Sequence, residues 1–226
     1  MRENYPLEQD AIRVRPAQEG DLEAVAAILV EAFRSMFEAA LAERVDRAER
    51  IVAQTIALEV PRGLPGLYVA EVKLPTASEG DTGDQTCRRV AGTIALRRRS
   101  DPEPSDWNAS GILFGELGLW GGLRAMFYFS LLDQSCRRDE VYVSDVAVAP
   151  DMRQRGIGRA LLRHAEQVAR SWGKAALVLD VTARNEGAIR LYERMGYHVQ
   201  RRRRPLLACW LLKERAWVRM RKELFG

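Results

Sequence analysis

Histidine and cysteine are scarce in this chain, which has two histidines and three cysteines among its 226 residues. Cys87, Cys136 and Cys209 lie far apart, and no two of them have the spacing of zinc ligands or of a redox pair. His164 and His198 are equally isolated in the sequence. We therefore expect no metal cofactor, and a reducing compartment such as the cytoplasm.

An apolar signal segment is also missing, because the N-terminal residues MRENYPLEQD are polar. Only residues 111–132 form a long apolar run, and Glu116, Arg124 and several glycines make a membrane span there costly, so we expect none. The run favours a helical insertion that packs on the core or forms a homodimer interface. A lid over a substrate pocket and a contact with a membrane surface are the alternatives.

Lysine is rare as well: 31 of the 35 basic residues are arginine, and the net charge is +4. Arginine suits bidentate contacts with phosphates and carboxylates, although codon bias would produce the same composition. Such mild basicity does not establish nucleic-acid binding, and we expect none. Residues 201–204, four consecutive arginines, could attract an acidic substrate or RNA, or could be a solvated strand end.

The spacing of apolar residues predicts one α/β domain with the element order β-α-α-β-β-β-α-β-α-β-β. The domain spans residues 1–226, with a core at about 11–204, an insertion at about 97–139 and a C-terminal strand at about 214–222. The predicted strands cover residues 11–17, 67–72, 90–96, 141–150, 175–182, 197–203 and 216–220, and the predicted helices cover residues 22–33, 37–60, 157–172 and 186–195.

Residues 141–163, VYVSDVAVAPDMRQRGIGRALLR, combine a strand, a turn rich in arginine and glycine, and the start of an amphipathic helix. The first N–H groups of a helix lack partners within the helix and attract anions together with the helix dipole. Gly156 and Gly158 leave room for a ligand to approach the backbone. The pattern R-x-x-G-x-G is neither a dinucleotide fingerprint nor a Walker A loop. It predicts a phosphate cradle, or more simply a glycine-containing strand-to-helix turn.

Two segments, VAVAPDMRQRGIGRALL and LDVTARNEGAIRLYERMGY, resemble the central motifs of the GNAT superfamily of acyl-CoA N-acyltransferases. The resemblance is specific over residues 141–201, extends only to topology over residues 11–96, and does not cover residues 97–139. It implies a mixed, mostly antiparallel twisted sheet of about seven strands flanked by about four helices. It also implies a central strand that carries a bulge and splays from the next strand.

The resemblance further implies that acetyl-CoA, as co-substrate, lies in the opening between those two strands. The pantetheine arm would pair with the backbone of Val146, Ala147 and Val148, and Asn185 would open the following helix near that arm, also serving as a helix cap. The pyrophosphate would lie on the turn, whose residues are Arg153, Gln154, Arg155, Gly156, Ile157, Gly158, Arg159 and Ala160.

Tyr192 matches the tyrosine that many family members place beside the thioester sulfur. It would protonate the departing thiolate, or would only pack against the cofactor arm. A backbone N–H near Val146 would stabilise the oxyanion during direct attack by an amine. Cys136 and Cys209 lack a histidine partner, which disfavours an acyl-cysteine intermediate.

The general base departs from the family pattern. Many members carry paired acids just before the apolar triplet of the central strand, and here that pair is Ser144 and Asp145. Asp145 is the candidate base, directly or through a water, unless its role is structural; Glu140 and Tyr142 are the next candidates. Strand alternation predicts that Ser144 and Asp145 point to opposite faces, so that only one can face the substrate.

The resemblance implies an acetyl-CoA-dependent N-acetyltransferase that acts on a primary amine of a small molecule, a peptide N-terminus or a protein lysine. The alternative is a non-catalytic acyl-CoA sensor or interaction module that retains the cradle. The residues that would shape the acceptor pocket lie outside the matching segments, so the sequence does not identify the acceptor.

Overall fold

The computed structural model describes residues 11–74, 87–101, 106–130, 135–203 and 216–225. Cys209, Arg204 and the start of the predicted C-terminal strand at about 214 lie outside the described residues.

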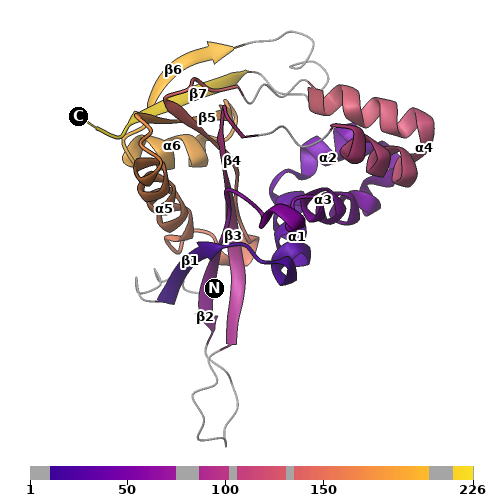
Figure 1. Ribbon diagram of the computed structural model, residues 1–226, viewed down its shortest axis with the longest axis horizontal. Coiled ribbons are helices and arrows are strands. Elements are labelled where there is room, and N and C mark those ends of the chain that lie inside the picture. Colours follow the sequence, from indigo (N-terminus) through magenta and orange to yellow (C-terminus); the bar gives the residue numbers. More distant parts are fainter. Residues whose placement is uncertain (1–10, 75–86, 102–105, 131–134, 204–215, 226) are drawn as a thin grey trace, which may run out of the picture.

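A seven-stranded sheet runs through the middle of the molecule in the order β1-β2-β3-β4-β5-β7-β6 (Figure 1). Only β4 and β5 are parallel, and every other neighbouring pair is antiparallel. The predicted fold class is therefore confirmed. The strands are β1 (Ile12–Pro16), β2 (Leu67–Leu74), β3 (Cys87–Arg98), β4 (Glu140–Val148), β5 (Ala176–Thr182), β6 (His198–Arg203) and β7 (Trp217–Glu223).

Helices cover both faces of this sheet. On one face lie α5 (Ile157–Ser171) and α6 (Glu186–Arg194), drawn at the left of Figure 1. On the other lie α1 (Leu22–Ala32), α2 (Arg34–Leu41), α3 (Ala48–Ala57) and α4 (Asp106–Ser130). Short 3₁₀ turns occupy Glu19–Asp21, Ala42–Arg47, Val60–Arg62 and Pro150–Met152.

The prediction of one continuous helix over residues 37–60 is wrong. The chain leaves the helix at Ala42, whose φ of 54° is left-handed, and a 3₁₀ segment separates α2 from α3. No glycine or proline marks this break in the sequence, so apolar spacing alone joined the two helices. Since the insertion is also helical, the described residues contain six α-helices rather than about four.

The core at β5 and α5 follows the predicted pattern. β5 is buried over Ala176, Leu177, Val178 and Leu179, as expected for a strand covered on both faces. From α5, Ile157, Leu161, Leu162, Ala165 and Ala169 are buried against the sheet. Burial of each leucine contributes about 1.5–3 kcal/mol. This packing fixes the N-terminus of α5 relative to the end of β4.

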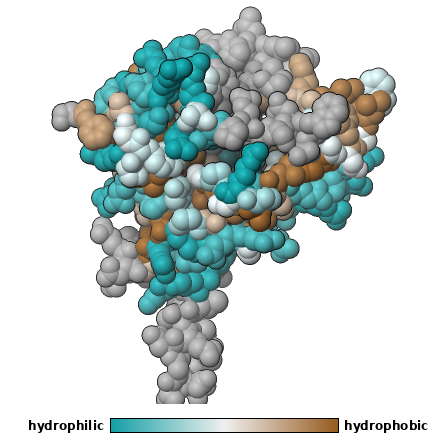
Figure 2. Space-filling view, in the orientation of Figure 1, coloured by the Kyte–Doolittle hydropathy of each residue, from teal (hydrophilic) through white to brown (hydrophobic). Residues whose placement is uncertain are grey.

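The insertion forms α4, which packs against α2 and α3 in a second apolar cluster that includes Phe37, Leu41 and Leu117. Gly118, with φ 72°, kinks the helix. An exposed apolar face remains on α4, visible as the brown surface at the right of Figure 2 and formed by Leu119, Trp120, Leu123, Met126 and Phe127. Among the described residues, no helix has the length and apolarity to cross a membrane.

Candidate active site

The two parallel strands at the centre of the sheet separate along their length. β4 pairs with β5 only over Glu140–Tyr142 and Ala176–Val178. Beyond these residues, β4 continues to Val148 and β5 to Thr182 without pairing to each other. The β5-facing edge of Val146, Ala147 and Val148 is thus unpaired within the sheet, and an extended ligand can hydrogen-bond to such an edge.

A bulge bends β4 beside this opening. On β3, Thr93 pairs with Ala147 and Ala95 with Ser144, so β4 has one residue more than β3 between the two pairs. Asp145 takes up the extra length with a left-handed φ of 55°, a conformation that aspartate tolerates better than most residues do. The bulge and the separation of the strands agree with the implied geometry.

The expectation that Ser144 and Asp145 point to opposite faces is wrong, because the bulge interrupts the alternation. The Ser144 hydroxyl donates a hydrogen bond to Asp145 Oδ2 at 3.1 Å. Ser144 is buried, whereas Asp145 as a whole residue is exposed. Desolvation raises the pKa of Asp145, while the hydrogen bond from Ser144 and the charge of Arg97 oppose the rise.

The two other candidate bases are engaged elsewhere. Glu140 accepts hydrogen bonds from Arg221 Nε at 3.1 Å and from the Arg137 N–H at 2.9 Å, at the far end of β4 from the bulge. Burial, followed by the charge of Asp180, raises the pKa of Tyr142 well above its usual value. Tyr142 therefore remains protonated near neutral pH and is a hydrogen-bond donor rather than a base.

The turn after β4 exposes a set of backbone N–H groups. Gln154 and Gly156 have left-handed φ values of 63° and 89°, and Gly156 is the N-cap of α5. The first backbone hydrogen bond of the helix runs from the Ala160 N–H to the Gly156 carbonyl at 3.0 Å. Within the described part of the chain, the N–H groups of residues 154–159 have no acceptor. Free N–H groups at the start of a fifteen-residue helix suit a phosphate group.

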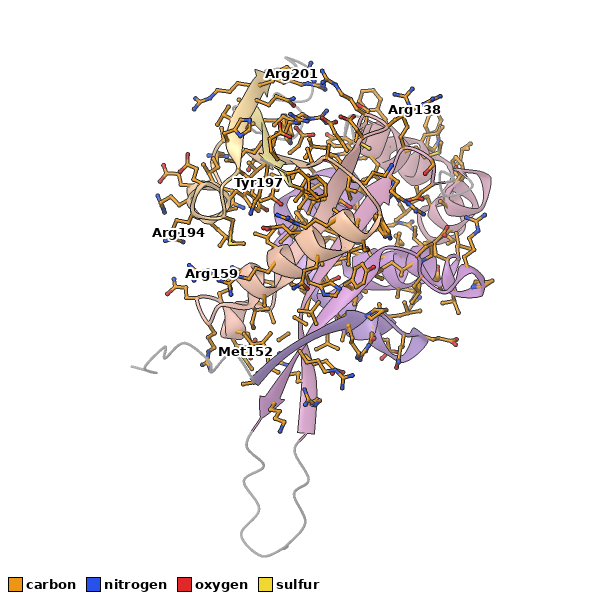
Figure 3. The ribbon with its side chains drawn as sticks, turned by 60° about the vertical axis from the view of Figure 1, so that its left-hand side comes forward. Arg138, Met152, Arg159, Arg194, Tyr197 and Arg201 are labelled. Carbon is orange, nitrogen blue, oxygen red and sulfur yellow. The ribbon has the colours of Figure 1, made fainter. Side chains whose placement is uncertain are left out.

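Arginines surround the same turn. Arg153 Nε donates to the Val148 carbonyl at 3.3 Å, which fixes the turn against the end of β4. Arg155 Nε is buried without a partner among the described residues. Arg159 projects from the first turn of α5, on the same side of the molecule as Arg194 of α6 (Figure 3). Their charges add to the attraction for an anion.

α6 lies directly against the turn. A Cβ placed on Gly158 would come within 3.1 Å of Leu191 Cδ2, so this glycine permits close packing of α5 on α6. Asn185 caps α6, its Oδ1 accepting from the Ala188 N–H at 3.1 Å, and the predicted cap is confirmed. Tyr192 is buried beside Tyr197, with ring centroids 5.7 Å apart, and burial raises its pKa to about 12. Such a phenol stays protonated near neutral pH.

A polar cluster missing from the sequence prediction lies where β4 and β5 separate. Arg219 of β7 holds Asp180 of β5, with 2.6 Å between Nη2 and Oδ2. The Tyr142 hydroxyl donates to the same Oδ2 at 3.4 Å, and the guanidinium carbon lies 5.8 Å from the centre of the Tyr142 ring. The sequence feature that could have indicated this cluster is Asp180, the one charged residue in the segment AALVLDVT.

Comparisons with known proteins agree with this geometry. The model of the acetyltransferase (GNAT) family matches residues 86–197. Among solved structures, one acetyltransferase superposes with a TM-score of 0.62 at 22% identity, over 94% of this chain and 100% of that one. The structure of yncA from Salmonella typhimurium, which contains its cofactor acetyl-CoA, has a TM-score of 0.53 at 18% identity, over 95% of each chain. These likenesses establish the fold.

Sequence relatives match a shorter segment. Streptothricin acetyltransferase of Streptomyces lavendulae is 42% identical over 69 residues, which are 30% of this chain and 36% of the relative. The ribosomal protein bS18-alanine N-acetyltransferase of Escherichia coli K12 is 43% identical over 60 residues, 26% of this chain and 40% of the relative. The matches thus span well under half the length of these relatives. Together with the family match and the shared fold, they show that the chain belongs to the GNAT acetyltransferase family.

Proposed function

We propose that this protein is an acetyl-CoA-dependent N-acetyltransferase that transfers an acetyl group to a primary amine. The acceptor is a small molecule, a peptide N-terminus or a protein lysine, and it attacks directly in a ternary complex. One observation carries the proposal: two parallel strands separate beside a helix N-terminus whose preceding turn has free N–H groups.

Described residues would hold the pyrophosphate and the pantetheine arm of the co-substrate. The free N–H groups of residues 154–159, with Arg153, Arg155 and Arg159, would hold the pyrophosphate. The unpaired edge of Val146, Ala147 and Val148 would pair with pantetheine. The turn continues into α5 through Ile157, Gly158 and Ala160, and Asn185 would lie near the pantetheine arm. Bound acetyl-CoA supplies an activated acyl thioester with a thiolate leaving group.

Two side chains, Asp145 at the bulge of β4 and Tyr192 of α6, suit proton transfer during aminolysis of that thioester. Asp145, with its raised pKa, would accept the proton of the attacking amine, directly or through a water. Tyr192, protonated near neutral pH, would donate a proton to the departing sulfur. The register leaves Asp145 and Val146 without partners on β3, and the Val146 N–H would stabilise the oxyanion.

Two measurements test the proposal. Calorimetric titration should show that acetyl-CoA binds, and thiol release should follow addition of an accepted amine. The amine panel includes streptothricin, a peptide with N-terminal alanine and a lysine peptide, because the sequence relatives modify the first two kinds of acceptor. Tight binding without turnover on any amine would favour the non-catalytic acyl-CoA-binding module, and absence of binding would refute both functions.

A further inference from the structure

We propose that Tyr142, held by Asp180 and Arg219, positions the acceptor amine for attack. Tyr142 would accept a hydrogen bond from the amine on the side of the sheet opposite the phosphate turn. The inference rests on the proposed acetyl transfer and assigns a role in acceptor binding to a cluster outside the cofactor site.

The cluster lies on the face of the sheet covered by α1–α4. Trp217 and Arg219 are two residues apart on β7 and share a face, and Trp217 packs against the apolar cluster that contains α4 residues. Arg219 Nη1 donates to the Ser135 carbonyl at 3.0 Å, and Ser135 lies between α4 and β4. Val218 and Met220 alternate with Trp217 and Arg219 along β7 and point to the opposite face of the sheet. An acceptor would therefore reach Tyr142 from the side opposite α5 and α6.

The hydrogen bonds fix the direction in which the Tyr142 proton points. Asp180 Oδ2 accepts hydrogen bonds from Arg219 Nε at 3.1 Å and from Arg219 Nη2 at 2.6 Å. The Tyr142 hydroxyl has one hydrogen and gives it to Asp180. No described residue donates a hydrogen bond to the Tyr142 oxygen, so this oxygen can accept one from an amine N–H.

Tyr142 lies at the point where β4 and β5 begin to separate. Tyr142 is the last β4 residue that pairs with β5. Beyond this point, Asp145 lies on the unpaired part of β4 and Asp180 on the unpaired part of β5. Burial is the main cause of the raised pKa of the Tyr142 hydroxyl, and the charges of Asp180 and Asp145 also raise it. An amine held by Tyr142 would thus stand near Asp145, the proposed base.

A contribution to folding stability does not by itself explain why Tyr142, Asp180 and Arg219 form a buried polar cluster. Arg219 and Tyr142 are 7% and 6% exposed, and burying an ion pair costs desolvation energy that apolar residues of similar volume would avoid. The other residues of β5 around Asp180 are apolar, so the sheet could have continued without the pair. A role toward a ligand accounts for its presence.

Tyr142→Phe tests the proposal, because it removes the hydroxyl and keeps the ring. Acetylation is measured with whichever of streptothricin, the alanine peptide and the lysine peptide the wild type turns over fastest. We expect the KM for that amine to rise about tenfold, the equivalent of one hydrogen bond, with the Kd for acetyl-CoA unchanged. Asp180→Asn should raise the same KM, and the double variant should be no worse than Tyr142→Phe alone.

Tyr128→Phe is the matched control, since Tyr128 is a buried tyrosine of α4 outside the cluster and should leave both constants unchanged. A Tyr142→Phe protein with wild-type KM for the amine would overturn the inference while the proposed function stands. Additive effects in the double variant, or a lower Tm without a change in KM, would show a structural role and also overturn it. Failure of the wild type to acetylate any amine would refute the proposed function itself, and the inference with it.

Discussion

The two faces of the central sheet use different chemistry. On the α5/α6 face, the candidate cofactor site consists mainly of backbone: free N–H groups in a turn, an unpaired strand edge and a capped helix. On the α1–α4 face, side chains from β4, β5 and β7 form the polar cluster at the opening. A backbone site serves one constant ligand whatever the neighbouring side chains are. A side-chain site can differ with each acceptor, so under the proposed function one face would bind the common co-substrate and the other would select the amine.

The largest effect should come from breaking the backbone site. Gly156→Glu introduces a side chain at a left-handed φ and a negative charge at the start of α5, and should weaken acetyl-CoA binding about 1000-fold or more. Calorimetric titration measures the loss. Gly173→Glu is the control, because Gly173 also has a left-handed φ, 66°, and open surroundings at the other end of α5. Equal losses of acetyl-CoA affinity in both variants would contradict the assignment of the phosphate site to the turn before α5.

Removal of the proposed base should be the next largest effect. Asp145→Asn should lower kcat/KM for the amine about 1000-fold and leave the Kd for acetyl-CoA unchanged. In the wild type, activity requires the ionised carboxylate, so kcat/KM should fall as the pH drops through the raised pKa of Asp145. The pH at which kcat/KM falls should therefore lie above the usual pKa range of an aspartate. If kcat/KM does not depend on pH in this range and the Asp145→Asn variant stays active, Asp145 is excluded as the base.

Tyr192→Phe should lower kcat about 100-fold, because the departing thiolate loses its proton donor. Binding of acetyl-CoA should stay within about twofold, because only one hydroxyl is removed. Tyr197→Phe removes a neighbouring buried hydroxyl that has no partner among the described residues, and serves as the control for loss of a phenol. If both variants retain wild-type kcat, Tyr192 only packs against the cofactor arm.

Ser144→Ala should produce the smallest change, a shift of the pH profile. The hydrogen bond from Ser144 lowers the pKa of Asp145, so its removal should raise that pKa further. The acidic limb of kcat/KM should move to higher pH, while the rate at alkaline pH stays near the wild-type value. A limb that does not move would mean that another group titrates in this range.

The sequence predicted the backbone face much better than the side-chain face. Gly156 and Asn185 act within their own turns, so local patterns identified the start of α5 and the cap of α6. Asp180 and Arg219 are 39 residues apart in sequence, and only the sheet order brings them together. Asp145 shows the same limit, because alternation holds only for a regular strand, and the resemblance implied a bulge on this strand without placing it at Asp145.

A crystal structure with acetyl-CoA bound tests the central claim most directly. The account predicts that the pyrophosphate oxygens accept hydrogen bonds from the N–H groups of residues 154–159 and that pantetheine pairs with Val146, Ala147 and Val148 between β4 and β5. Phosphates bound elsewhere, for example on the arginines of β6, with the turn and the edge of β4 left free, would contradict it.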